Sequence, residues 1–258
     1  MSSHRLFAAV AIAITAIVAR AEETPKPQRT ILAVGAHAGD MELTCGALLS
    51  KAAHKGDRVV LLHLTLGERG NPRLSSTAYA EQKRREATAV AEALGAEARF
   101  APYRDGELPN DDEARLYAAR VIREVKPARV ITHWRRSMHK DHEAASAIVR
   151  DAVLLASLDG VLPAQPVWRG VRTVWYAENW EDADEFKPYV YVDVTGEIPR
   201  WREAVAKYEF VGGKISSFAY LDYYTALATV RGAEARKGQA VAFEVESYAK
   251  RRILDELP

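Results

Sequence analysis

The chain has 258 residues, of which 48% are hydrophobic and 28% charged, which suits one compact domain with a full core. Its formal net charge of +1 gives no bulk electrostatic reason to expect nucleic acid or an anionic membrane as a partner. The single cysteine, Cys45, excludes an intramolecular disulfide, so the fold must depend on its core. We expect Cys45 to be a small buried residue rather than a reactive thiol. Composition leaves the oligomeric state open.

The N-terminal segment has the order of charged, apolar and small residues that is typical of a secretory signal peptide. Arg5 precedes an apolar run over residues 6–19, and Ala19 and Ala21 then bracket Arg20. A membrane anchor is the alternative, but this run is short for the ~30 Å of hydrocarbon in a bilayer. We therefore predict cleavage after Ala21, no stable membrane span in the mature chain, and export to a periplasmic or extracellular location.

The predicted domain organisation follows from this boundary. Residues 1–21 form the signal peptide, 22–29 a polar, proline-bearing leader, and 30–258 a single α/β domain.

Apolar strands and amphipathic helices alternate along this domain. Strands are predicted at 30–36, 57–67, 98–103, 128–134, 171–178 and 189–195. Helices are predicted at 42–54, 78–94, 112–125, 142–157, 199–208 and in the C-terminal part. Strands that are apolar throughout and separated by helices indicate a mostly parallel sheet that is covered on both faces. The expected fold is a Rossmann-like three-layer α/β sandwich.

Histidine and carboxylate residues follow two of these strands. His37 and Asp40 are three residues apart after the first strand, and His139 and His142 are three apart after the fourth. Ligands bind at the carboxyl ends of parallel strands, so both pairs belong to the same edge. Two imidazoles and one carboxylate form a ligand set that leaves an open position on zinc. A single histidine more often has a structural role, which we expect for His63 within its strand.

The motifs "GAHAGDMELTCGALL", "TLGERG", "DGEL" and "HKDH" resemble, in this order, those of the PIG-L/LmbE-like zinc deacetylase family. The resemblance extends from about Thr30 to Tyr248. It implies removal of an acetyl group from an N-acetylglucosamine-type sugar, with a metal-bound water as nucleophile.

Carried over by position, the resemblance assigns the ligands of Zn²⁺ or another divalent metal to His37, Asp40 and His142. It implies that His139 contacts the acetyl carbonyl and stabilises the developing oxyanion. Asp141 either orients a histidine or caps the helix that follows.

Two further positions match residues that bind substrate in this family. Asp105 of "DGEL" falls where the family has an acid that holds sugar hydroxyls, and Lys83 matches a basic substrate contact. Both side chains are also compatible with ordinary surface positions.

The chain departs from the family at its first motif, where His-Pro-Asp-Asp-Glu is replaced by "HAGDME". Gly39 stands where the family has the aspartate that acts as general base. Glu42, in the following turn, is our preferred replacement, although an acid there also suits the helix dipole. Glu68, which follows the neighbouring strand, is expected at the same rim as a second candidate base or a substrate contact.

The sequence thus predicts a metal-dependent amide hydrolase acting on a small molecule or glycan that carries an N-acetyl group. The alternative is a pseudoenzyme that keeps the metal and binds an acetylated glycan without turning it over. A nucleotide-binding domain is disfavoured because the spacing G-x-G-x-x-G is missing, and a serine hydrolase because G-x-S-x-G is missing.

Overall fold

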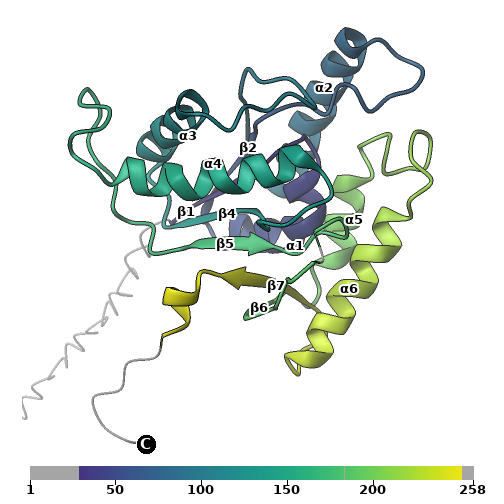
Figure 1. Cartoon of the computed structure of the whole chain (residues 1–258). Coiled ribbons are helices and arrows are strands. Elements are labelled where there is room, and N and C mark those ends of the chain that lie inside the picture. Colours follow the sequence, from purple (N-terminus) through teal and green to yellow (C-terminus); the bar gives the residue numbers. More distant parts are fainter. Residues whose placement is uncertain (1–28, 183, 252–258) are drawn as a thin grey trace, which may run out of the picture.

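The computed structural model describes residues 29–182 and 184–251, so the predicted signal peptide and nearly all of the leader lie outside the described residues. Strands and helices alternate over most of this length (Figure 1). The strands are β1 (Thr30–Gly35), β2 (Arg58–His63), β3 (Glu97–Phe100), β4 (Arg129–His133), β5 (Val174–Ala177), β6 (Val190–Asp193) and β7 (Ala240–Val245). The helices are α1 (Asp40–His54), α2 (Ser76–Leu94), α3 (Asp112–Val125), α4 (Lys140–Ala156), α5 (Ile198–Val205), α6 (Tyr220–Glu234) and the 3-10 turn η1 (Ser247–Lys250).

The strands form one mixed sheet in the order β3-β2-β1-β4-β5-β7-β6. β1 to β5 pair in parallel, whereas β7 is antiparallel to both β5 and β6. The predicted α/β class with a mostly parallel sheet is confirmed. The pattern missed β7, where only helices were expected, because Glu244 interrupts its apolar run. Glu244 is buried, and its carboxylate is paired with Lys250.

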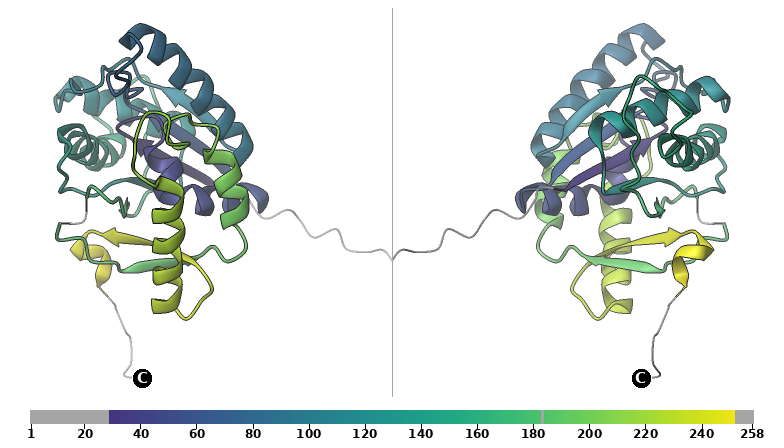
Figure 2. Two further views of the ribbon diagram at one scale, coloured as in Figure 1. Left: turned by 90° about the vertical axis from the view of Figure 1, so that its right-hand side faces the viewer. Right: turned by 90° about the vertical axis from the view of Figure 1, so that its left-hand side faces the viewer.

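Helices cover both faces of the sheet. Leu32 and Val34 of β1 pack into a core with α3 and α4, whereas Ala33, which points to the other face, packs with α1 and α2. Cys45 of α1 is buried in this second core, as predicted. Figure 2 shows the teal helices α3 and α4 on one side of the sheet, with the blue α2 and green α5 on the other.

This topology brings the loops after β1 to β5 to one edge of the sheet. In parallel α/β sheets that edge is the usual place for a ligand. Within residues 29–182 and 184–251, no helix is long and apolar enough to cross a membrane.

Candidate metal centre and pocket

A cavity of about 230 Å³ opens at this edge of the sheet. Most of its ionisable side chains come from the loops after the parallel strands or from the first turn of the helix that follows: His37, Asp40, Asp105, His139, His142 and Glu181. Its apolar wall is mostly aromatic: Tyr79, Trp180, Phe210, Tyr220 and Tyr224, with Leu43 and Ile215. The cavity therefore combines a polar floor with several aromatic faces.

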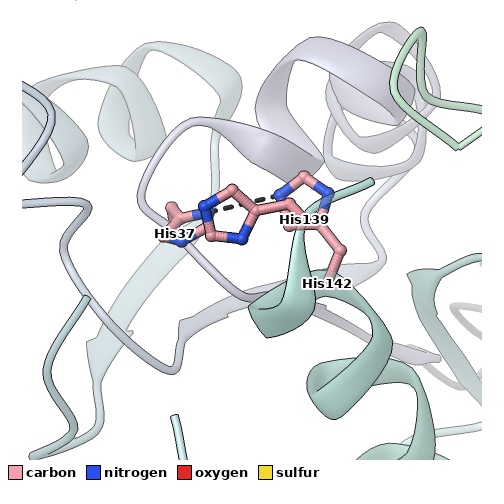
Figure 3. A group of neighbouring side chains, drawn as sticks. All are labelled: His37, His139 and His142. Atoms are coloured by element: carbon pink, nitrogen blue, oxygen red, sulfur yellow. Dashed lines mark hydrogen bonds between the residues drawn. The ribbon is translucent and has the colours of Figure 1, made fainter. Parts of the chain in front are cut away.

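Three of the polar side chains converge on one point. His37 Nδ1 lies 3.3 Å from His142 Nε2 and 3.3 Å from Asp40 Oδ2, and His142 Nε2 lies 3.6 Å from the same oxygen. Figure 3 shows His37 facing His142 from the loop after β1, with His139 beside them at the start of α4. Ligands about 2.0–2.2 Å from a tetrahedral zinc are separated from one another by roughly 3.3–3.6 Å. The three atoms that the sequence predicts as ligands have this spacing.

A carboxylate lies close to the outer nitrogen of each of these two histidines. His37 Nε2 lies 3.1 Å from Asp105 Oδ1, and His142 Nδ1 lies 3.2 Å from Asp182 Oδ1. A proton on each outer nitrogen leaves an unprotonated lone pair on His37 Nδ1 and on His142 Nε2. Carboxylates commonly hold metal-binding histidines in this way.

The converging atoms are therefore two nitrogen lone pairs and one carboxylate oxygen. Such acceptors repel one another unless a cation lies between them. Without a metal ion a proton takes this place: burial alone would lower the pKa of His37, but the Asp40 charge and neighbouring carboxylates raise it well above its usual value. Burial would raise the pKa of Asp40, but His37, His142 and His133 lower it well below its usual value. The residues fit a divalent metal ion.

Other groupings of nearby ligand atoms overlap this one: His37 with His139 and His142, Asp40 with His133 and His142, and His37 with Asp105 and Asp141. His133 bridges two carboxylates, with Nε2 3.0 Å from Asp40 and Nδ1 3.3 Å from Asp182. Burial would lower the pKa of His133, but these carboxylates raise it to about 9. His133 Nε2 also accepts the Ala36 backbone N–H at 3.0 Å, so this buried ring lies between Asp40, Asp182 and the end of β1, and it does not line the cavity.

His139 is placed differently from the other histidines of the site. It is the N-cap of α4, and its Nδ1 accepts a hydrogen bond from the Asp141 backbone N–H at 3.2 Å. Nε2 therefore carries the proton, and the residue lines the cavity. Burial and the neighbouring His37 and His142 lower the pKa of His139. A neutral imidazole that presents an N–H to the cavity suits the predicted contact with an oxyanion.

Asp141 lies beneath this floor and is fully buried. Its Oδ2 accepts the Gly106 backbone N–H at 2.6 Å and lies 3.6 Å from His37 Nε2. Of the two roles left open by the sequence, the structure favours orientation of a histidine, because His139 takes the capping position.

Asp105 lines the cavity, and Glu68, which does not line it, accepts a hydrogen bond from the backbone of Asp105. Asp105 Oδ2 accepts the Arg69 backbone N–H at 3.0 Å, and Glu68 Oε1 accepts the Asp105 backbone N–H at 3.0 Å. Glu68 is not part of the lining. This geometry does not favour Glu68 as a base or as a direct substrate contact.

Glu42 is also turned away from the cavity. It is fully buried, Oε1 accepts the Tyr208 hydroxyl at 2.6 Å, and Oε2 accepts the Gly39 backbone N–H at 3.2 Å. Residue 42 is about 200° around the helix axis from Asp40, because each residue adds about 100°. The preferred replacement base of the sequence analysis therefore stabilises the first turn of α1 instead, as the dipole argument allowed. His63, predicted to be a core residue, is buried next to it at 3.5 Å.

The space beside Gly39 is filled by residues from two other elements. Gly39 has φ 115°, and a Cβ built on it would lie 2.8 Å from Phe210 Cζ and 3.7 Å from Lys83 Nζ. Lys83 on α2 is only 4% exposed, donates to the Ala38 carbonyl at 2.5 Å and lines the cavity. An aromatic ring and a buried amine thus occupy the space where the resemblance implies an aspartate side chain.

Sequence reasoning missed two acids that follow β5. Asp182 is the buried partner of His133 and His142, whose hydrogen bonds lower its pKa to about 2 although burial opposes this. Glu181 lines the cavity, and burial followed by the charges of Asp40 and Asp182 raises its pKa. Their signal was the pair of adjacent acids directly after a parallel strand, at the same edge as both histidine pairs.

Comparison with known proteins gives this geometry a context. Residues 32–153 match the family described as GlcNAc-PI de-N-acetylase. The chain is 33% identical over 180 residues to a 1D-myo-inositol 2-acetamido-2-deoxy-alpha-D-glucopyranoside deacetylase from Geodermatophilus obscurus, with 58% of this chain and 61% of that protein covered. It is 25% identical over 223 residues to a 4-oxalmesaconate hydratase from Pseudomonas putida, with 83% of this chain and 84% of that protein covered.

A solved structure agrees with the fold. The crystal structure of 4-carboxy-2-hydroxymuconate hydratase from Pseudomonas putida superposes with a TM-score of 0.76 at 22% identity, covering 90% of this chain and 100% of that one. Similarity at this level of identity concerns the arrangement of strands and helices. The relatives thus include deacetylases and a hydratase.

Proposed function

Because the chain belongs to the PIG-L/LmbE-like family, we propose that it is a metal-dependent N-deacetylase for a neutral, amino-sugar-type substrate. The observation that carries the proposal is the convergence of His37 Nδ1, Asp40 Oδ2 and His142 Nε2 within 3.3–3.6 Å. Zinc is the preferred ion, because two imidazoles and one carboxylate form a common catalytic zinc site.

A divalent ion at these atoms would supply Lewis acidity and lower the pKa of a water molecule to about 7. The chain's own residues supply the remaining functions. His139 presents its Nε2–H to the position of a developing oxyanion, and the loss of one such donor typically costs about 10²- to 10³-fold in rate. Asp105, Asp141 and Asp182 hold His37 and His142 in the tautomers that face Asp40.

The charges of the cavity support a neutral substrate. Lys83 is the cationic lining residue that is not a histidine, and it faces three lining carboxylates, Asp40, Asp105 and Glu181. Such a surface repels a substrate with several carboxylates. The aromatic faces of Trp180, Phe210 and Tyr220 instead suit the apolar faces of a sugar ring.

Hydration of a carbon–carbon double bond is the second candidate. It is favoured by the hydratase relative, which matches over 84% of its length, and by Gly39 in place of the aspartate base. The carboxylates named in that relative's substrate, however, would require more cationic groups than this cavity offers.

The experiment combines metal analysis with two assays. We expect close to one divalent ion per chain and release of acetate from N-acetylated amino sugars. Activity should disappear with a chelator and return with Zn²⁺. The second assay tests hydration of unsaturated carboxylates, which is measured as a loss of their absorbance. If the protein hydrates these compounds and releases no acetate from the amino sugars, the hydratase function is supported and the deacetylase function is wrong. A metal-loaded protein that turns over neither class would support the glycan-binding pseudoenzyme.

Export through residues 1–21 forms part of the same proposal. It is supported by the order of charged, apolar and small residues in that segment. The mature protein is expected to begin at Glu22, and N-terminal sequencing of the exported protein tests this.

A further inference from the structure

Lys83 lies beside Gly39, the position at which the resemblance implies a general base. Its Nζ would be 3.7 Å from a Cβ on Gly39. Its aliphatic stem comes from the middle of α2, so its position is set by a 19-residue helix rather than by a loop. The amine also lines the cavity, which gives it access to a bound water or substrate.

The surroundings of this amine are unusual for a lysine. It donates to the Ala38 carbonyl and lies over the rings of Phe210 and Tyr208, 4.1 and 4.5 Å from their centroids. Within residues 29–182 and 184–251 it forms no ion pair with a carboxylate. Buried lysines that lack such a partner are rare, and they readily change protonation state.

Titratable groups face the amine from each neighbouring element. They are Glu42 and Asp40 on α1, Glu86 on α2, Asp105 after β3, His63 at the end of β2, and Tyr208 after α5. The carboxylates favour the ammonium form, but burial outweighs them and lowers the pKa of Lys83 to about 8. About one tenth of the amine is then neutral at pH 7.

We propose that Lys83 is the proton-transfer group of this site and takes the place of the aspartate that is missing at Gly39. This inference rests on the proposed deacetylase function. Apart from the chain neighbours of Gly39, the three heavy atoms nearest to a Cβ at this position are two carbons of Phe210 and Lys83 Nζ, and Lys83 also lines the cavity. Glu42 and Glu68 do not line the cavity, and Glu181 lies beside His142, 3.5 Å from its Nδ1.

The proposed step balances without an additional reactant. The neutral amine takes a proton from water as the water oxygen bonds to the acyl carbon, and His139 stabilises the resulting oxyanion. The ammonium then passes this proton to the substrate nitrogen as the carbon–nitrogen bond breaks. Water has thereby supplied the hydroxyl group of acetic acid and one hydrogen of the free amine, and Lys83 is neutral again.

The first test is a direct titration in metal-free protein, which does not depend on activity. Nitrogen-15 NMR of the lysine side chains should show one amine that titrates near pH 8, and this signal should be missing from K83M. A Lys83 amine that titrates near the ordinary value of about 10.4 would overturn the proposal.

The second test is chemical rescue in the metal-loaded protein. K83A and K83M should each lose about 10²- to 10⁴-fold in kcat, as expected when a general base is removed. Small primary amines should restore activity to K83A, in which a space opens onto the cavity, with rates that depend on the amine pKa. K83M is the matched control, because its side chain fills that space and should prevent rescue.

The outcomes separate this inference from the proposed function. If wild-type protein releases acetate but K83A keeps its kcat, or stays folded and metal-loaded without rescue by any amine, the role of Lys83 is wrong and the deacetylase stands. If wild-type protein releases no acetate, the proposed function fails, whatever the titration of Lys83 shows.

Discussion

The two parts of the chain on either side of residue 153 contribute different things to one cavity. Residues 32–153, which match the deacetylase family, supply the converging His37, Asp40 and His142, and also Gly39 and Lys83. Residues after 153 supply most of the aromatic wall and the acids that follow β5. All three proposed metal ligands therefore come from the first part. The space beside Gly39 is filled from both parts, by Lys83 of the first and Phe210 of the second.

The largest effect is expected on metal binding, from substitution of a proposed metal ligand in the first part of the chain. D40N keeps the size of Asp40 but replaces a charged oxygen ligand that lies 3.3 and 3.6 Å from the two histidine nitrogens. Metal affinity should fall by more than the roughly 100-fold expected for a residue outside the ligand set. Acetate release should fall with it. Metal content after dialysis measures the effect, and D112N, at an exposed position, is the control. Full metal content in D40N would rule out the proposed ligand set.

The next effect concerns the stability of the folded chain. Because burial lowers the pKa of Lys83 from 10.5 to about 8, the unfolded chain binds a proton more readily than the folded one between these values. The loss of folding stability caused by burying the Lys83 ammonium is present in full below pH 8 and disappears as the pH rises to 10.5. K83M should therefore unfold with a free energy up to about 3 kcal/mol higher at pH 7, and this gain should vanish near pH 10.5.

Denaturant unfolding at several pH values measures this gain. K55M, at an exposed lysine after α1, should show no such pH dependence. A gain in K83M that stays constant up to pH 10.5 would point to packing and not to the amine charge.

A smaller effect tests the contribution of the second part to the metal. D182N removes the charge that faces His142 Nδ1 and His133 Nδ1 but keeps the shape of the side chain. Metal affinity should fall about 10- to 100-fold, as is usual for partners of metal-binding histidines. Competition with a chelator of known affinity measures it, with D222N at an exposed position as control. Unchanged affinity would show that Asp182 does not hold His142.

The sequence predicted those parts of the site that depend on local rules. Apolar strands separated by helices gave the sheet, and polar residues at strand ends gave His37, Asp40, His139 and His142. The helical period alone could have excluded Glu42 as the replacement base, because Glu42 lies about 200° around α1 from Asp40. Phe210 could not be predicted, because its contact with Gly39 joins segments 171 residues apart through tertiary packing. Asp182 belongs to no motif, and its role appears only when β5 is placed beside β4.

The last prediction joins the two parts at Gly39 itself. If the site lacked only its base, G39D would raise the rate, but two features of the structure argue against this. The φ of 115° disfavours any side chain, at a cost of about 1–3 kcal/mol, and the new Cβ would meet the Phe210 ring at 2.8 Å. G39D should therefore be less stable than the parent chain and gain no activity.

In G39D with F210A the clash is removed while the backbone strain remains, so part of the lost stability should return. F210A alone is the matched control, because it opens the same space without adding a carboxylate. If the double variant exceeds F210A in kcat, the added aspartate acts as a base once the ring is gone. If G39D alone gains activity, the Phe210 ring moves aside readily. Packing by the second part of the chain then does not prevent an aspartate at position 39 from acting as the base.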